Sequence, residues 1–110
     1  MRDAGPTSTA TERAFESIAK ALAKKGAEAG KMFGMQCLKA NGKAFAGIFG
    51  DDLVFKLGGD DHAAAMKLAG AVLFDPSGAG RPMKEWVVVP RAHQKKWPTL
   101  AAAAVAYVCG

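Results

Sequence analysis

Few residues of this 110-residue chain have the types and spacing that chemistry requires. The clearest group is acidic: Asp51-Asp52 and Asp60-Asp61, with His62 directly after the second pair. A zinc site needs several convergent His or Cys ligands, and the chain has only two histidines. Aspartates are also typical of tight turns and of the first residues of helices. We therefore interpret both pairs as turn and capping residues and predict no metal site.

Cysteine chemistry would depend on Cys37 and Cys109, the only two cysteines. A catalytic thiolate needs an adjacent base such as His93, and the spacing of these residues does not indicate one. Two cysteines can form one disulfide, but they do not make the framework of a disulfide-rich secreted domain. The sequence favours two reduced thiols, with Cys37 packed as a small apolar side chain. We predict no catalytic residue and no enzymatic activity.

Two glycine-containing segments partly match nucleotide-binding loops. Residues 26–31 read Gly-Ala-Glu-Ala-Gly-Lys, one residue shorter than a phosphate-binding loop, and Met32 stands where a Ser or Thr is required. The segment Gly78-Ala79-Gly80 lacks the third glycine and the following helix of a dinucleotide-binding fingerprint. Neither segment meets the requirement of its motif, so we predict no cofactor.

The formal net charge of +5 suits an acidic partner, and two groups of basic residues could provide the contacts. Lys39 and Lys43 flank an expected hairpin turn, whereas Arg91, Lys95 and Lys96 lie together before the last expected helix. A basic hairpin tip can enter a groove of DNA while Lys and Arg contact phosphates. Lysines at sheet edges and turns also prevent aggregation. These five residues are the candidate nucleic-acid contacts.

Three helices are expected to flank a sheet. Thr9 and Glu12 form a capping-box pattern before an apolar stripe at helical spacing, which predicts a helix over about residues 10–25. Asp60-Asp61 as an N-cap predicts a short helix over 62–69. Proline is typical of a first helical turn, so Pro98 predicts a last helix over 98–108.

The sheet is predicted from turns and from alternating apolar residues. Asn41-Gly42 is the strongest hairpin signal, because both residues tolerate the positive φ of a type I′ turn. This turn would pair Leu38 with Phe45, and a second turn at Asp51-Asp52 would complete a three-stranded antiparallel meander. Further strands are expected over 72–74 and 84–89, as a second hairpin.

The predicted meander has two different faces, because side chains alternate across a sheet. One face is purely apolar and should contact the helices: Met35, Cys37, Ala46, Ile48, Leu53, Phe55 and Leu57. The other face mixes apolar residues with Gln36 and Lys56, and its apolar members are Leu38, Phe45, Phe49 and Val54. We consider these four residues the candidate protein-interaction face, although a shift of one residue in register would exchange the two faces.

Size and composition indicate one globular domain over residues 9–110, after a disordered tail over 1–8. The longest apolar stretch has only ten residues, 100–109, which is too short to cross a bilayer. The N-terminus lacks the apolar region of a signal peptide. We therefore expect a cytoplasmic protein without membrane contact.

Short motifs follow one another along the chain: Met32-Phe33-Gly34, Gly42-Lys43, Phe45-Ala46, Leu53-Val54-Phe55-Lys56, Gly70, Phe74, Val89-Pro90 and Leu100 before the run of alanines. In this order and spacing, over about residues 15–108, the chain resembles the N-terminal domain of the TfoX (Sxy) family of competence regulators. It departs from the family at Met35, where a second glycine is usual, and at Phe55, where a tyrosine is usual. An acidic residue is also common where Trp97 stands.

The resemblance implies an α+β domain with an antiparallel sheet and flanking helices. It also implies a connection to the regulation of DNA-uptake genes, without an established enzymatic activity. Full-length members carry a further C-terminal domain, which these 110 residues do not include. We therefore expect a non-enzymatic regulatory or protein-interaction domain whose partner is another protein, with nucleic-acid binding as the alternative. The sequence leaves the oligomeric state open, a homodimer included.

Overall fold

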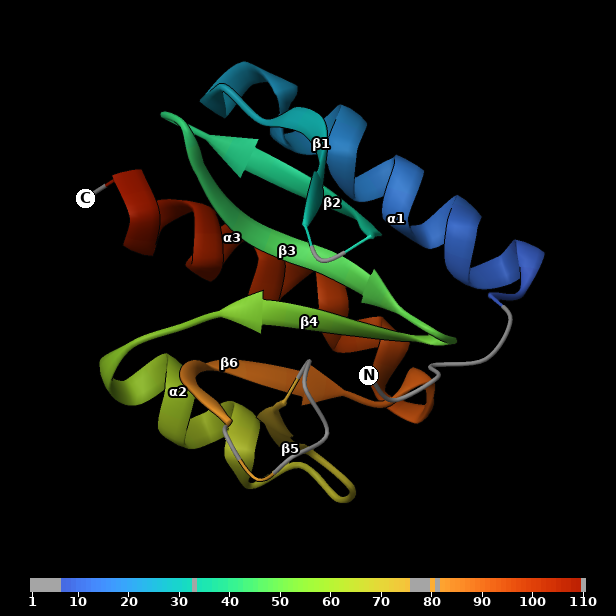
Figure 1. Cartoon of the computed structure of the whole chain (residues 1–110). Helices are drawn as coiled ribbons and strands as arrows, with labels where there is room; N and C mark the ends of the chain where they lie inside the picture. The colour runs from blue at the N-terminus through green and yellow to red at the C-terminus, as the bar shows by residue number, and fades with distance from the viewer. Residues whose placement is uncertain (1–6, 33, 76–79, 81, 110) are drawn as a thin grey trace.

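The computed structural model is an α+β fold in which, over the described residues, three α-helices accompany a six-stranded antiparallel sheet (Figure 1). It describes residues 7–32, 34–75, 80 and 82–109. The elements in chain order are α1 (Thr9–Leu22), the 3₁₀ helix η1 (Ala23–Lys25), β1 (Glu28–Met32), β2 (Met35–Ala40), β3 (Lys43–Phe49), β4 (Asp52–Lys56), α2 (Gly59–Met66), β5 (Val72–Phe74), β6 (Met83–Val89), the 3₁₀ helix η2 (Arg91–Lys96) and α3 (Trp97–Cys109).

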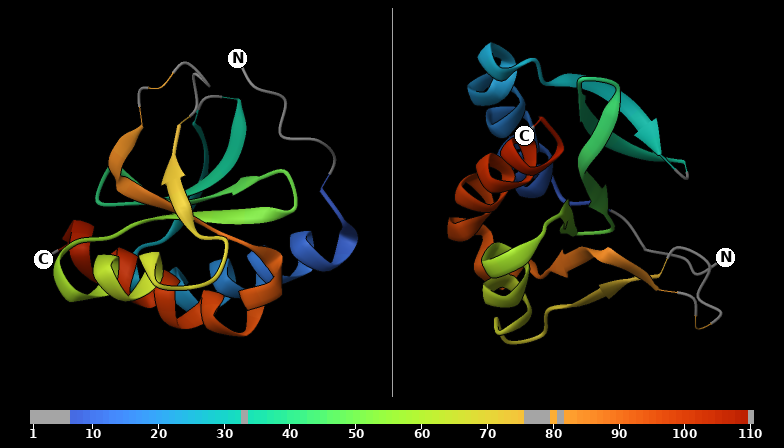
Figure 2. Two further views of the ribbon diagram at one scale, coloured as in Figure 1. Left: turned by 90° about the horizontal axis from the view of Figure 1, so that it is seen from below. Right: turned by 90° about the vertical axis from the view of Figure 1, so that its left-hand side faces the viewer.

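The strands are arranged in the order β1-β2-β3-β4-β6-β5, so the second hairpin joins the meander through pairing of β6 with β4. All three helices lie on one face of this sheet, and the sheet bends around its other face (Figure 2). The bend brings Met32 and Met35, at the β1–β2 end, against the same apolar cluster as Phe74 and Met83, at the β5–β6 end. The sheet therefore has an apolar layer on each side.

The β2–β3 hairpin contains the predicted turn and an unpredicted bulge. Asn41 and Gly42 have φ angles of 53° and 75°, as a two-residue turn of this type requires. The register then shifts between Leu38 and Lys39, so that Leu38 pairs with Ala46 and not with Phe45. Phe45 is the extra residue of a β-bulge. The predicted pairing of Leu38 with Phe45 is therefore wrong by one residue.

The bulge exchanges the faces of β2 relative to the prediction. Leu38 and Ala40 pack in the core beneath the helices, whereas Met35 contacts the cluster on the opposite face of the sheet. The turn between β3 and β4 also differs, because Phe49 pairs with Asp52 and leaves Gly50 and Asp51 as the turn residues. That difference shifts the pairing by two residues, so β4 and the part of β3 after Phe45 keep their predicted faces.

The predicted protein-interaction face does not exist as an exposed surface. Leu38, Phe45 and Val54 have exposed fractions of 1%, 0% and 0%, and Phe49 is half-buried. Leu38 and Phe45 belong to the core beneath the helices, whereas Val54 and Phe49 belong to the opposite cluster together with Trp86. The prediction was wrong because it omitted the bulge and because the bent sheet covers its own second face.

The first helix begins one residue earlier than its capping pattern suggested. Ser8, not Thr9, is the N-cap, since its hydroxyl accepts a hydrogen bond from the amide of Thr11. Gly26 ends the helical segment in the left-handed conformation, with φ 87°. Thr7 and Ser8, which we assigned to the disordered tail, are hydrogen-bonded to the β3–β4 turn. Residues 1–6 of that tail, and Gly78-Ala79, lie outside the described residues.

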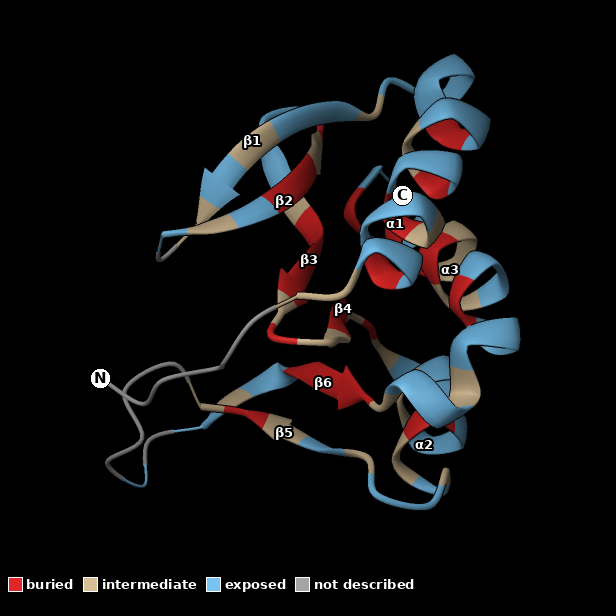
Figure 3. Ribbon diagram, turned by 90° about the vertical axis from the view of Figure 1, so that its right-hand side faces the viewer, coloured by how far each residue is buried: buried red, intermediate tan, exposed pale blue. Residues whose placement is uncertain are grey.

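Other boundaries differ modestly from expectation. Strand β1 was not predicted, and α2 occupies Gly59–Met66 where residues 62–69 were expected. The last helix begins at Trp97, whose side chain is fully buried and donates a hydrogen bond from Nε1 to the carbonyl oxygen of Val89 at 3.2 Å. The buried parts of the helices and of the strands face one another (Figure 3). Leu100 of α3 is only half-buried, whereas Ala104, Val105 and Val108 of the same helix are buried.

Candidate functional site

Helices α2 and α3 lie side by side and run in opposite directions (Figure 2). At one end, the ring of Tyr107 near the end of α3 occupies the space that a Cβ atom on Gly58 would need, directly before α2. At the other end, Nε2 of His93, before α3, lies 2.8 Å from the carbonyl oxygen of Ala69, after α2. These contacts fix the two helices at both ends.

Two grooves among the described residues lie where helices meet. One, between α1 and α3, has a volume of about 390 Å³, and the other, between α2 and α3, has a volume of about 620 Å³. We call it the α2–α3 groove; it has a volume of 620 Å³ and is open along its length. Its lining residues are Asp61, Ala64, Ala65, Leu68, Lys95, Lys96, Thr99 and Leu100. The walls of the groove are partly apolar, because Leu68 and Leu100 are half-buried in its lining and Ala64 is exposed there.

The two ends of the groove carry opposite charges. Asp61 lies in the first turn of α2, where a carboxylate stabilises the positive end of the helix dipole. Lys95 and Lys96 lie at the other end, beside the C-terminal end of α2, and both are exposed. No carboxylate among the described residues forms an ion pair with either lysine. The groove therefore has an acidic end and a basic end, and the two lysines of the basic end form no ion pair with described residues.

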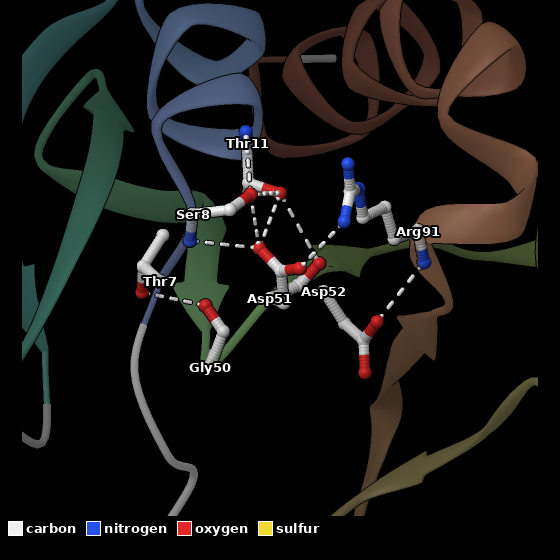
Figure 4. Close-up of polar contacts among 7 residues, drawn as sticks. All are labelled: Thr7, Ser8, Thr11, Gly50, Asp51, Asp52 and Arg91. Carbon is white, nitrogen blue, oxygen red and sulfur yellow. Dashed lines mark hydrogen bonds and ion pairs between the residues drawn. The ribbon is translucent and has the colours of Figure 1, made fainter.

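Arg91, the third basic residue of this segment, is already engaged (Figure 4). Its guanidinium lies 3.2 Å from the carboxylate of Asp51, and its amide donates to Asp52 at 2.9 Å. Asp51 also accepts hydrogen bonds from the hydroxyls of Ser8 and Thr11, at 2.6 and 2.7 Å. The bonds from Ser8, from Thr11 and then the charge of Arg91 hold the pKa of Asp51 well below its usual range.

The acidic residues singled out in the sequence thus have structural roles at separate places. Asp51 and Asp52 connect α1, the β3–β4 turn and η2, whereas Asp60 and Asp61 lie in the first turn of α2. Nε2 of His62 lies 2.8 Å from the carbonyl oxygen of Lys84 on β6. Within the described ranges, no three His, Cys, Asp or Glu side chains gather closely enough to hold a metal ion.

The five candidate nucleic-acid contacts do not form one surface. Lys39, near the end of β2, and Lys43, at the start of β3, flank the hairpin turn, whereas Arg91 contacts the turn that follows β3. A strand of seven residues separates these places by roughly 20 Å. The aliphatic part of Lys39 also lies over Gly30 of β1. The structure brings Lys95 and Lys96 together with apolar residues, not with the basic hairpin.

The two cysteines lie in different environments. Cys37 is buried, and this burial raises the pKa of its thiol, whereas Cys109 is exposed at the end of α3. Both thiols are free. A thiol that resists ionisation is a poor nucleophile, so the environment of Cys37 favours a packing role.

A smaller groove of 390 Å³ lies between α1 and α3. Its lining is uncharged and consists of Ala14, Ser17, Ile18, Ala21, Gln94, Trp97 and Pro98. It offers no charged group that would select or orient a partner. The α2–α3 groove combines apolar surface with directional charge and is therefore the better candidate site.

Comparison of the chain with protein-family models, with curated proteins and with solved structures finds no match. The resemblance to the TfoX N-terminal domain therefore stays a prediction. None of the helices in the described parts of the chain has the length and apolarity needed to cross a bilayer.

Part of this site was predicted from the sequence, but with a different role. The sequence predicts Lys95 and Lys96 as nucleic-acid contacts and Asp61 as a capping residue, but it does not group them with Ala64, Leu68 and Leu100 in one site. The signal that could have found them is helical spacing: Asp61, Ala64, Ala65 and Leu68 follow the i, i+3, i+4, i+7 pattern of one helix face. This spacing does not predict that α3 lies beside α2 and forms the second wall of the groove.

Proposed function

We propose that this protein is a non-enzymatic interaction domain that binds a segment of a partner protein in the α2–α3 groove. The observation that carries the proposal is the open apolar strip of Ala64, Leu68 and Leu100 between two antiparallel helices. Binding an amphipathic segment in a groove between helices is a common mode of peptide recognition, in which apolar anchors fill the groove. The regulatory role and the cytoplasmic location expected from the sequence are parts of this proposal.

The shape of the groove favours a peptide over a small molecule. Sites for small ligands enclose most of the ligand surface and have several polar groups that converge on it. Here Asp61 and the two lysines lie on different elements towards opposite ends of the groove, and the groove is open to solvent. Helix α2 has eight residues and is about 12 Å long, which matches roughly two turns of a bound helix.

Two alanines of α2 provide a matched pair of variants. Ala63 and Ala64 are both exposed on this helix, but only Ala64 lines the groove. The variant Ala64→Arg places a long charged side chain in the groove, whereas Ala63→Arg places the same side chain outside it. Because both positions are exposed, each substitution should change the free energy of unfolding by no more than about 0.5 kcal/mol.

The test is capture of proteins from a lysate of the source cell on the immobilised domain, with and without nuclease. We expect a partner that the wild type and Ala63→Arg retain, that Ala64→Arg loses, and that nuclease does not release. Equal capture by Ala63→Arg and Ala64→Arg would contradict the groove as the binding site. Retention of nucleic acid alone, with loss of all protein after nuclease treatment, would instead support the nucleic-acid alternative.

A further inference from the structure

We infer that the partner segment is apolar in its middle and acidic at one end, and that its carboxylates bind at Lys95 and Lys96. This inference rests on the proposed function, since it names the chemistry of the segment that occupies the α2–α3 groove. It is carried by the placement of two unpaired lysines beside half-buried leucines.

No carboxylate of the described structure forms an ion pair with the two lysines at this end of the groove. Lys95 and Lys96 have no ion-pair partner there, whereas their neighbour Arg91 is paired with Asp51. The two lysines also directly precede α3, whose first turn contains no acidic residue. The partial positive charge at the N-terminus of α3 adds to the charge of the lysines, whereas the C-terminal ends of η2 and α2 beside them carry partial negative charge. A carboxylate from another molecule would relieve this concentration of like charge.

The apolar part of the groove requires an apolar part of the ligand. Leu68 and Leu100 are each half-buried, so a partner side chain placed between them removes apolar surface from water on both walls. A polyanion without apolar groups, such as a nucleic acid backbone, would leave these leucines exposed. Apolar contact and charge together favour a segment in which Leu, Ile, Met or Phe lies close to Asp or Glu.

Asp61 gives the groove a direction. It lies in the first turn of α2, and the antiparallel packing places it at the end of the groove away from Lys95 and Lys96. An acidic residue of the partner at that end would face a like charge, which disfavours the reversed orientation. The acidic end of the segment should therefore lie at the lysines in every complex.

A second lysine pair supplies the control for a test of charge. Lys24 and Lys25 are adjacent, exposed, and lie in η1, on the opposite side of the molecule from α2 (Figure 1). The variants Lys95→Glu/Lys96→Glu and Lys24→Glu/Lys25→Glu change the net charge equally. We expect the first to weaken capture of the partner by about ten-fold or more, and the second to weaken it by less than about two-fold at physiological salt.

The bound segment itself can be identified by a photo-crosslinking amino acid placed at Thr99, which is exposed in the groove. Sequencing of the crosslinked peptide should give Asp or Glu within about one helical turn of apolar residues. Replacing those acidic residues by lysine should restore capture by the Lys95→Glu/Lys96→Glu variant.

The outcomes separate this inference from the proposed function. If Ala64→Arg abolishes capture but Lys95→Glu/Lys96→Glu does not, the groove binds a partner whose charge does not matter. That outcome overturns the inference and leaves the proposed function intact. A crosslinked peptide without acidic residues overturns it as well. Failure of the wild-type domain to capture any protein overturns both the proposed function and the inference. A crosslink to a second copy of this chain would overturn the inference unless the crosslinked segment is acidic and apolar as described.

Discussion

At the β3–β4 turn a single carboxylate, that of Asp51, connects elements that lie far apart in the sequence. It accepts hydrogen bonds from Ser8 and Thr11 at the start of α1 and forms an ion pair with Arg91 of η2 (Figure 4). The sequence identified Asp51 as a turn residue, which it is. Its contacts with α1 could not be predicted, because they join residues about 40 positions apart and depend on the completed fold.

The ionised form of Asp51 should contribute to stability in a pH-dependent way. Its pKa is lower in the folded protein than in the unfolded chain, so its contribution is present above about pH 4 and is lost as the pH falls further. Asp51→Asn cannot ionise. We therefore expect the difference in free energy of unfolding between wild type and Asp51→Asn to shrink as the pH is lowered below about 4. Urea unfolding of both proteins at a series of pH values measures this difference. A difference that does not change with pH would contradict the hydrogen bonds and the ion pair of Asp51.

Tyr107 provides a second test at the level of a residue, because it is the only tyrosine. Its hydroxyl donates a hydrogen bond to the carboxylate of Glu85 at 2.5 Å, and this bond raises the pKa of Tyr107. Replacing Glu85 by glutamine should lower the pKa of Tyr107 toward its ordinary value. Ultraviolet absorbance of the tyrosinate during a pH titration measures the change directly. An unchanged titration curve would show that the two side chains do not interact in solution.

At the level of elements, the β2–β3 hairpin shows what local sequence can and cannot predict. The Asn41-Gly42 turn was predictable because its positive φ angles restrict the residues that fit. The bulge at Phe45 was not, because it needs no special residue and serves to place both Phe45 and Ala46 in the core beneath the helices. One unpredicted residue thus exchanged the faces of β2 and removed the predicted interaction face.

The turn itself should be sensitive to one methyl group. A Cβ atom on Gly42 would meet no other atom, so the cost of Gly42→Ala comes from its φ of 75° alone. We expect Gly42→Ala to lower the free energy of unfolding by about 1 kcal/mol. Asn41→Gly, at φ 53°, is the control and should change the free energy of unfolding by only about a few tenths of a kcal/mol. Chemical denaturation measures both, and equal effects would contradict the turn geometry.

Helices α2 and α3 were both expected, but their packing was not. The stripe of Ala64, Ala65 and Leu68 indicates a helix face that packs against something, without saying what. Its partner face lies about 35 residues further along the chain and is positioned by the intervening hairpin of β5 and β6. The groove is therefore a property of two elements together, which explains why it could not be predicted from either segment alone.

At the level of the whole molecule, the α+β class and the antiparallel sheet were predictable from the order of helix and strand patterns. The single six-stranded sheet was not, because pairing of β6 with β4 is not local. The bend of the sheet followed neither from turns nor from alternation, yet it decides which surfaces remain free. By covering the second face of the sheet with its own hairpins, it removes the exposed interaction face that the sequence predicted (Figure 2).

The most direct measurement is the affinity of the domain for the partner segment that crosslinks at Thr99, determined by calorimetry for wild type, Ala63→Arg and Ala64→Arg. Both variants should unfold at nearly the same temperature as the wild type, because both alanines are exposed. We predict that Ala64→Arg weakens binding by about ten-fold or more and that Ala63→Arg weakens it by less than about two-fold. Equal affinities for the two variants would contradict binding in the α2–α3 groove.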